Sequence, residues 1–180
     1  MMEVAAALLS THAMVWGPEV LKPPMGMPFL LAAAACAWTL RLLPAETYAH
    51  DLPSMHDLVA LAFLVDLSQM AVHAASHAAP WLRASHALHH RATRPCPKDA
   101  FATGWIDAFT QMICPLFTSL WIVKPSRTTA MLFGLLYSHW LVYLHSDWPD
   151  HPVRFLVTPS GHKSHHARPD THLSHIFRCA

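Results

Sequence analysis

Four long apolar runs with few charges inside them constrain the fold of this chain more than any other feature. They lie near residues 28–43, 58–79, 106–123 and 128–144. Each is roughly 16 to 22 residues long, close to the ~20 that a helix needs to cross a bilayer. Charged residues make up only 13% of the chain, whereas soluble domains usually have about a quarter. The runs predict an all-α, integral-membrane bundle of about four transmembrane helices in two hairpins.

A soluble bundle with buried helices is the alternative fold, and the low charge disfavours it. Pro115 lies inside the third run, where a proline should kink the helix. A length of 180 residues suits a single domain. We expect residues 1–56 to form an N-terminal segment with the first transmembrane helix and its loop. Residues 57–180 are then expected to form the functional domain.

Basic residues orient the predicted hairpins. They follow the second run (Arg83, Arg91, Arg94, Lys98) and the fourth run (Arg154, Lys163, Arg168, Arg178). The loop between the first two runs, residues 44–56, contains no lysine or arginine. By the positive-inside rule, both basic regions face the cytosol. No basic run is long enough to predict a phosphate-binding patch, so we expect no nucleic-acid partner.

Histidine is unusually frequent, with 16 residues against 12 lysines and arginines together. The first cluster, His73 and His77, lies near the end of the second run. At positions i and i+4 of a helix, the two rings share one face and can bind one metal ion. Asp66 lies on nearly the same face, where its carboxylate could accept a ring N–H and orient the ligand. An unpaired charge inside an apolar span is costly, so Asp66 is expected to have such a partner.

Two further clusters share the spacing His-x-x-His-His. They are His86, His89 and His90, and His162, His165 and His166. Positions i, i+3 and i+4 lie near one helical face, so we expect each cluster to present three imidazoles to one point. Both clusters lie in the basic segments, which predicts a histidine-rich helical cap on the cytosolic side.

Eight clustered histidines suit a pair of metal ions better than one, since a closed tetrahedral zinc site needs only four ligands. Imidazole favours zinc, copper, iron and nickel, so the ligands alone do not separate iron from zinc. His145, at the cytosolic end of the fourth run, is a candidate ninth ligand. His139 and His172 are weaker candidates for further ligands.

At these residues the chain resembles the fatty acid hydroxylase/sterol desaturase superfamily of integral-membrane di-iron oxygenases. Those proteins carry a histidine pair, then His-x-x-His-His, then a hydrophobic hairpin and a second His-x-x-His-His. The order and spacing here are similar from His73 onward. Asp66 resembles an acidic residue that precedes the first histidine pair, and His145 resembles an extra histidine after the hairpin. The resemblance covers residues 57–180.

The resemblance implies an O₂-dependent lipid hydroxylase or desaturase of lipid biosynthesis, with two iron ions held by the histidines. Zinc could replace iron in the same ligands. The resemblance also implies a fatty acyl or sterol-like substrate and a separate electron donor, such as cytochrome b5 or a ferredoxin. Such a protein would lie in the endoplasmic reticulum of a eukaryote or the inner membrane of a bacterium.

After the third cluster the chain departs from the family pattern. The family has aspartate, asparagine and glycine at positions where this chain has Asp170, His172 and Ser174. The segment that follows is shorter than in typical members, so a non-catalytic member with a structural metal site is one alternative. A histidine-rich membrane metal transporter is another. A transporter would place ionisable residues in mid-span, whereas most of these histidines follow the runs.

Overall fold

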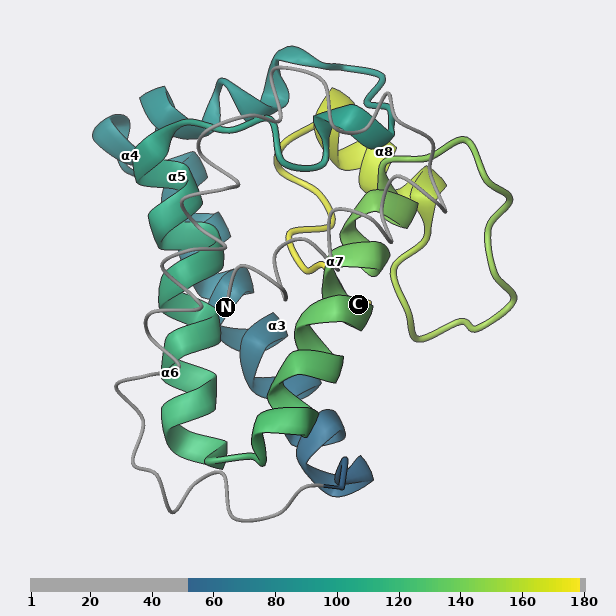
Figure 1. Ribbon diagram of the computed structural model, residues 1–180. Helices are drawn as coiled ribbons and strands as arrows, with labels where there is room; N and C mark the ends of the chain where they lie inside the picture. Colours follow the sequence, from purple (N-terminus) through teal and green to yellow (C-terminus); the bar gives the residue numbers. More distant parts are fainter. Residues whose placement is uncertain (1–51, 179–180) are drawn as a thin grey trace.

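A computed structural model of the protein describes residues 52–178 (Figure 1). Within that range the chain is helical, and its one β pairing is an isolated antiparallel bridge between Leu156 and Phe177. The all-α prediction is therefore confirmed for these residues. The first predicted span, residues 28–43, lies outside the described residues, as does nearly all of the predicted N-terminal segment.

The second apolar run forms helix α3 (Met55–Ala78). The helix begins at Ser54, whose hydroxyl accepts a hydrogen bond from the Asp57 backbone N at 3.2 Å. It ends just before Pro80, because the residue that precedes a proline disfavours helical backbone; Ala79 is extended. With 24 residues, α3 is long and apolar enough to cross a membrane.

The third apolar run forms α5 (Trp105–Ala108), a π-helical turn η5 (Phe109–Ile113) and α6 (Cys114–Val123). Together they make the second helix of the described range that could span a membrane. Pro115 follows the π-turn. A proline cannot donate a hydrogen bond to the carbonyl four residues earlier, and its ring crowds that carbonyl. The irregularity expected at Pro115 therefore takes the form of a π-turn.

The fourth apolar run forms α7 (Arg127–Leu144), which begins at Ser126. The turn from α6 is short, and Lys124 within it has a left-handed φ of 51°. Both α6 and α7 pack on α3 more than on each other. Among residues 52–178, only α3 and the Trp105–Val123 helix combine the length and composition of a membrane span. The count of four spans therefore stays a prediction.

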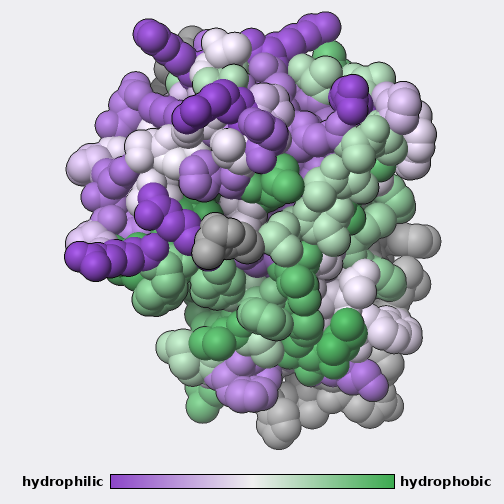
Figure 2. All heavy atoms as spheres, turned by 180° about the vertical axis from the view of Figure 1, so that it is seen from behind, coloured by the Kyte–Doolittle hydropathy of each residue, from purple (hydrophilic) through white to green (hydrophobic). Residues whose placement is uncertain are grey.

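The core lies between α3 and the two helices that pack on it. Leu61 and Val65 of α3 are buried against Leu120 of α6 and Phe133 of α7. Large apolar side chains are also exposed on these helices, among them Val59, Phe63, Leu67, Phe109, Trp121, Ile122 and Leu136. Figure 2 shows hydrophobic residues over the lower part of the molecule and hydrophilic residues gathered at the upper end. An exposed apolar belt of this kind suits contact with lipid.

Short helices cover the end of the bundle that lies opposite the turn between α6 and α7 (Figure 1). The second histidine cluster lies in α4 (Pro80–His86) and the 3-10 turn η3 (His89–Arg91), and the third lies in α8 (Pro159–Ala167). A further 3-10 turn, η4 (Pro97–Asp99), follows η3. In Figure 1, α4 and α8 lie at the top, opposite the turn between α6 and α7. The second and third histidine clusters lie in this cap, as the sequence predicts.

Candidate metal centre

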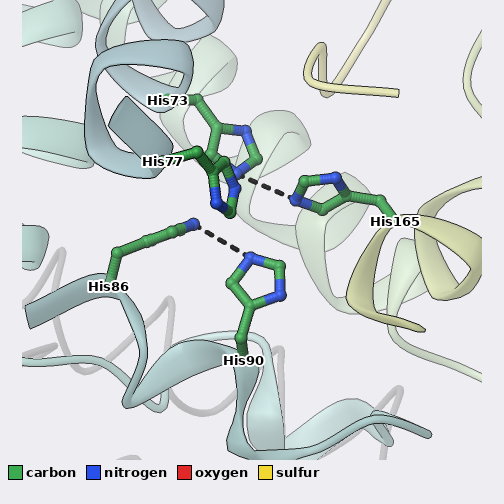
Figure 3. A group of neighbouring side chains, drawn as sticks. All are labelled: His73, His77, His86, His90 and His165. Atoms are coloured by element: carbon green, nitrogen blue, oxygen red, sulfur yellow. Dashed lines mark hydrogen bonds between the residues drawn. The ribbon is translucent and has the colours of Figure 1, made fainter. Parts of the chain in front are cut away.

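The nine histidines predicted as ligands lie together at the capped end of the bundle, in two groups. The five-histidine group consists of His73, His77, His86, His90 and His165, and the four-histidine group of His89, His145, His162 and His166. Within each group, one nitrogen of every ring lies within 4.8 Å of those of all the others. Figure 3 shows the rings of the five-histidine group pointing toward one another from three separate parts of the chain. Each group has the ligands to hold one metal ion.

Each His-x-x-His-His cluster divides between the two groups, so the expectation that it presents three rings to one point is wrong. In the second cluster, His86 and His90 belong to the five-histidine group and His89 to the other. α8 shows the reverse division, because only its middle ring, His165, joins the five-histidine group. Neighbouring helical positions such as i+3 and i+4 point about 100° apart. A helix that lies between two metal sites can therefore supply ligands to both.

Six of the nine rings make a hydrogen bond through Nδ1 to an oxygen outside the groups. The pairs are His73–Leu173 O (2.7 Å), His86–Asp107 Oδ1 (2.9 Å), His89–Ala102 O (3.3 Å), His145–Leu141 O (2.7 Å), His165–Thr171 O (2.5 Å) and His166–Ala92 O (3.0 Å). Carbonyl oxygens only accept hydrogen bonds, so Nδ1 of each ring bonded to one carries the hydrogen. In a neutral ring, Nε2 is then a bare lone pair that can bind a metal. Metal-bound histidines in proteins have this kind of outer support.

His73 and His165 have the geometry of two ligands that share a cation. Their Nε2 atoms are 3.0 Å apart, along one of the dashed lines of Figure 3. Both rings donate from Nδ1 to carbonyl oxygens, so both Nε2 atoms are lone pairs when the rings are neutral. Two lone pairs that face each other at this distance repel. A shared cation would turn that repulsion into attraction.

The same close approach of Nε2 atoms occurs twice more, in His86–His90 (3.0 Å) and His145–His162 (3.2 Å). Burial, reinforced by the neighbouring imidazoles, lowers the pKa of His165 to about 4 and the pKa of His145 to about 3. His165 and His145 are therefore uncharged at neutral pH, which suits them to bind a metal. Neutral imidazoles in this number fit a transition metal such as iron or zinc.

The Asp66 carboxylate holds the C-terminal segment rather than a ligand ring. Oδ1 accepts hydrogen bonds from His175 N (2.9 Å) and Ile176 N (2.8 Å), and Oδ2 accepts from Phe177 N (2.9 Å) and Ser174 Oγ (2.7 Å). These four donors satisfy a buried charge in α3. Asp66 has partners, as predicted, but they are backbone amides and a hydroxyl 108 to 111 positions away.

Asp107 has the role predicted for Asp66, namely to accept a hydrogen bond from the outer nitrogen of a clustered ring. Its Oδ1 lies 2.9 Å from His86 Nδ1, and both side chains are only 4% exposed. Ser85 Oγ accepts from the Asp107 backbone N at 3.0 Å, and the Thr103 hydroxyl donates to Oδ2. A carboxylate on the outer nitrogen fixes the ring and makes it a stronger ligand. The sequence signal for this role is an acidic residue at the start of the third apolar run.

The two weaker candidates, His139 and His172, belong to neither group. His172 is exposed with a left-handed φ of 51°, and His139 is half-buried in α7. His175, which the sequence analysis did not select, is buried beside the groups. Its ring centroid lies 5.1 Å from that of His73 and 5.4 Å from that of His162.

Two cavities reach the histidines. The larger, of about 440 Å³, lies beside the five-histidine group and is lined by Arg83 and Asp170 as well as by ligand rings. The smaller, of about 40 Å³, is lined by rings of both groups and by Gln111 of the π-turn. Gln111 Nε2 donates to Ser76 Oγ at 2.9 Å, whereas its Oε1 is buried without a hydrogen-bond partner. An O–H group in the smaller cavity, such as a water, would satisfy that oxygen.

Comparison with known proteins identifies the family. The profile of the fatty acid hydroxylase family matches residues 58–179, a stretch that contains all three histidine clusters and most of the chain. The chain therefore belongs to the fatty acid hydroxylase family. Membership supports a lipid-modifying oxidoreductase.

A curated relative comes from Phaeodactylum tricornutum (strain CCAP 1055/1) and is named "Alternative squalene epoxidase". The chain is 31% identical to it over 163 residues. The alignment covers 86% of this chain and 47% of the relative, so the chain spans about half the length of that protein. No solved structure matches the chain.

Proposed function

We propose that the protein is a membrane-bound, O₂-dependent lipid hydroxylase or desaturase with one iron ion in each histidine group. The observation that carries the proposal is the meeting of the bare Nε2 atoms of His73 and His165 at 3.0 Å, within nine clustered histidines. A cation between those two lone pairs would turn their repulsion into attraction. Family membership supplies the class of reaction.

The five-histidine group would hold one ion and the four-histidine group the other. Iron bound there would supply the reduction and activation of O₂ that attack on an unactivated C–H bond requires. The chain's own residues orient the ligands: Asp107 holds the His86 ring, and backbone carbonyls keep five other rings in the tautomer that bares Nε2. Zinc fits the same rings and could occupy the site as a substitute.

The proposed membrane placement has the histidine cap at the cytosolic face and four spans below it, including residues 28–43 and α7. The basic residues of the cap and the exposed apolar belt beneath it support this arrangement. The membrane would be the endoplasmic reticulum in a eukaryote or the inner membrane in a bacterium. A fatty acyl or sterol-like substrate could then reach the metals from within the bilayer.

Electrons would come from a separate protein, such as cytochrome b5 or a ferredoxin. Four arginines at the capped end are exposed, namely Arg83, Arg91, Arg94 and Arg168. A cationic surface of this kind suits a donor with an acidic face and speeds its docking.

The relative adds a second candidate reaction, the epoxidation of a polyene lipid such as squalene, because the likeness extends over 86% of this chain. The candidates differ in the fate of O₂. Hydroxylation and epoxidation each place one oxygen atom in the product and release the other as water. Desaturation releases both atoms as water.

Two other classes of function predict different behaviour. A histidine-rich metal transporter would move metal across vesicles and form no lipid product. A family member with a structural metal site would bind metal without consuming O₂. The position of the groups at one end of the helices, rather than in mid-span, disfavours transport.

The proposal is tested with the full chain, purified in mild detergent, loaded with Fe(II) and supplied with an electron donor, ¹⁸O₂ and either a lipid extract or squalene. We expect a lipid product that depends on O₂ and on His165. One ¹⁸O atom in that product indicates hydroxylation or epoxidation, and a new double bond without label indicates desaturation. Metal binding with no lipid product would overturn the proposed activity.

A further inference from the structure

We infer that His175 is an additional metal ligand, which completes the four-histidine group and gives each ion five imidazoles. The inference rests on the proposed metal centre and goes beyond the nine clustered histidines. The His-x-x-His-His spacing does not predict a role for this residue. The inference comes from its position in the fold.

His175 lies on the border between the two groups. Its side chain is buried, with 8% exposed, and its ring centroid is 5.1 Å from that of His73 and 5.4 Å from that of His162. These two rings belong to different groups. His175 also lines the small cavity that contacts both groups. A small movement of this ring would therefore bring it to a metal ion in either group.

The ring of His175 contains a buried nitrogen that has no protein partner. Nδ1 makes no hydrogen bond, whereas Nδ1 of six of the nine clustered histidines is bonded to an outer oxygen. Leaving a polar atom buried and unsatisfied is unfavourable. A bound metal ion would accept the lone pair of the imidazole.

The backbone of His175 is held from two sides. Its N–H donates to Asp66 Oδ1 of α3 at 2.9 Å, and its carbonyl oxygen accepts from Trp140 Nε1 of α7 at 2.6 Å. The buried carboxylate of Asp66 thus holds the segment that carries this ring. The anchoring fixes where the ring can reach, as the support of a ligand requires.

The number of ligands favours the ion of the four-histidine group. The five-histidine group already offers five imidazoles, so a six-coordinate ion there would have one position left for a reactant. The four-histidine group leaves two positions, and a fifth imidazole from His175 would leave one. Both ions would then have the same number of protein ligands and one open position each, as catalytic metal sites require.

The test uses the full chain and two substitutions, His175→Ala and His175→Gln, with His172→Ala as the matched control. His172 lies three residues earlier in the same segment but is exposed and belongs to neither group. Glutamine keeps a long polar side chain and removes the imidazole, which covers the case in which the alanine protein does not fold. The readouts are iron content during a chelator challenge and the number of imidazole ligands per iron from X-ray absorption.

We expect the wild-type protein and His172→Ala to retain both ions equally well. The His175 variants should release one of the two ions at least ~10-fold faster, with fewer imidazoles per iron. Two ions retained at the wild-type rate in both His175 variants would overturn the inference and leave the proposed function standing. A wild-type protein that binds no iron would instead contradict the proposed function itself.

Discussion

The Nε2 atoms of His73 and His165 lie 3.0 Å apart, although both rings already donate from Nδ1 to backbone carbonyl oxygens. His73 belongs to α3 and His165 to α8, 92 positions later in the chain. A cation between them would join the first described span to the cap, and its removal would leave two lone pairs facing each other. Metal should therefore stabilise the fold as well as supply the chemistry.

Removing the metal should lower the thermal stability of the protein in detergent. A ligand that binds only the native state, at 100 times its Kd, stabilises that state by about 2.7 kcal/mol. The measurement is a thermal unfolding scan before and after chelation, with Fe(II) added back as the control for reversibility. Equal unfolding midpoints with and without chelator would contradict a metal that bridges α3 and α8.

Single substitutions in the two groups should each remove one ion. His165→Ala takes a ligand from the five-histidine group, and His89→Ala takes one from the four-histidine group. Iron content should fall in both toward half of the wild-type value, and lipid oxidation should be lost, because the proposed O₂ chemistry uses both ions. His172→Ala should keep full iron and activity. The division into two groups is wrong if either ligand variant keeps all of its iron.

Asp107→Ala should weaken metal binding without removing a ligand. The carboxylate supports His86 through Nδ1 at 2.9 Å, and loss of such a partner typically lowers metal affinity 10- to 100-fold. Asp107→Asn keeps an oxygen that can accept the same hydrogen bond and should recover part of the affinity. Competition with a chelator of known affinity measures the effect. An unchanged affinity in the alanine variant would rule out this role for Asp107.

Asp66→Ala should release the C-terminal segment from α3. The substitution removes an acceptor from three backbone amides and one hydroxyl and should cost roughly 3 kcal/mol of stability. Ser68→Ala is the matched control, because the Ser68 hydroxyl bonds only to carbonyls of its own helix. The free energy of unfolding and the rate of proteolysis after residue 170 report the change. If both variants are equally stable, Asp66 does not hold the C-terminal segment on α3.

Local spacing was sufficient to predict much of this molecule. The end of α3 follows from Pro80, and the histidine clusters follow the ends of apolar runs, which predicted that they share one end of the bundle. The exchange of His89 and His165 between the groups could not be predicted in the same way. It depends on how α4, η3 and α8 approach one another, which no local pattern specifies.

Contacts between residues far apart in the chain account for the other differences. Asp66 lies on the helical stripe of His73, yet its carboxylate binds residues 108 to 111 positions away. His175 lies beside the metal groups because of that contact. His172, which was a candidate ligand in the sequence, is exposed and has a left-handed φ.

The most direct test of the account is the transition-metal content of the full chain after gentle purification in mild detergent, measured by mass spectrometry of the elements. With one ion in each histidine group, the protein should contain about two metal ions per chain, mainly iron. The double variant His89→Ala, His165→Ala should contain almost none. A wild-type protein that is folded, free of transition metal and unable to take up Fe(II) would contradict the central claim.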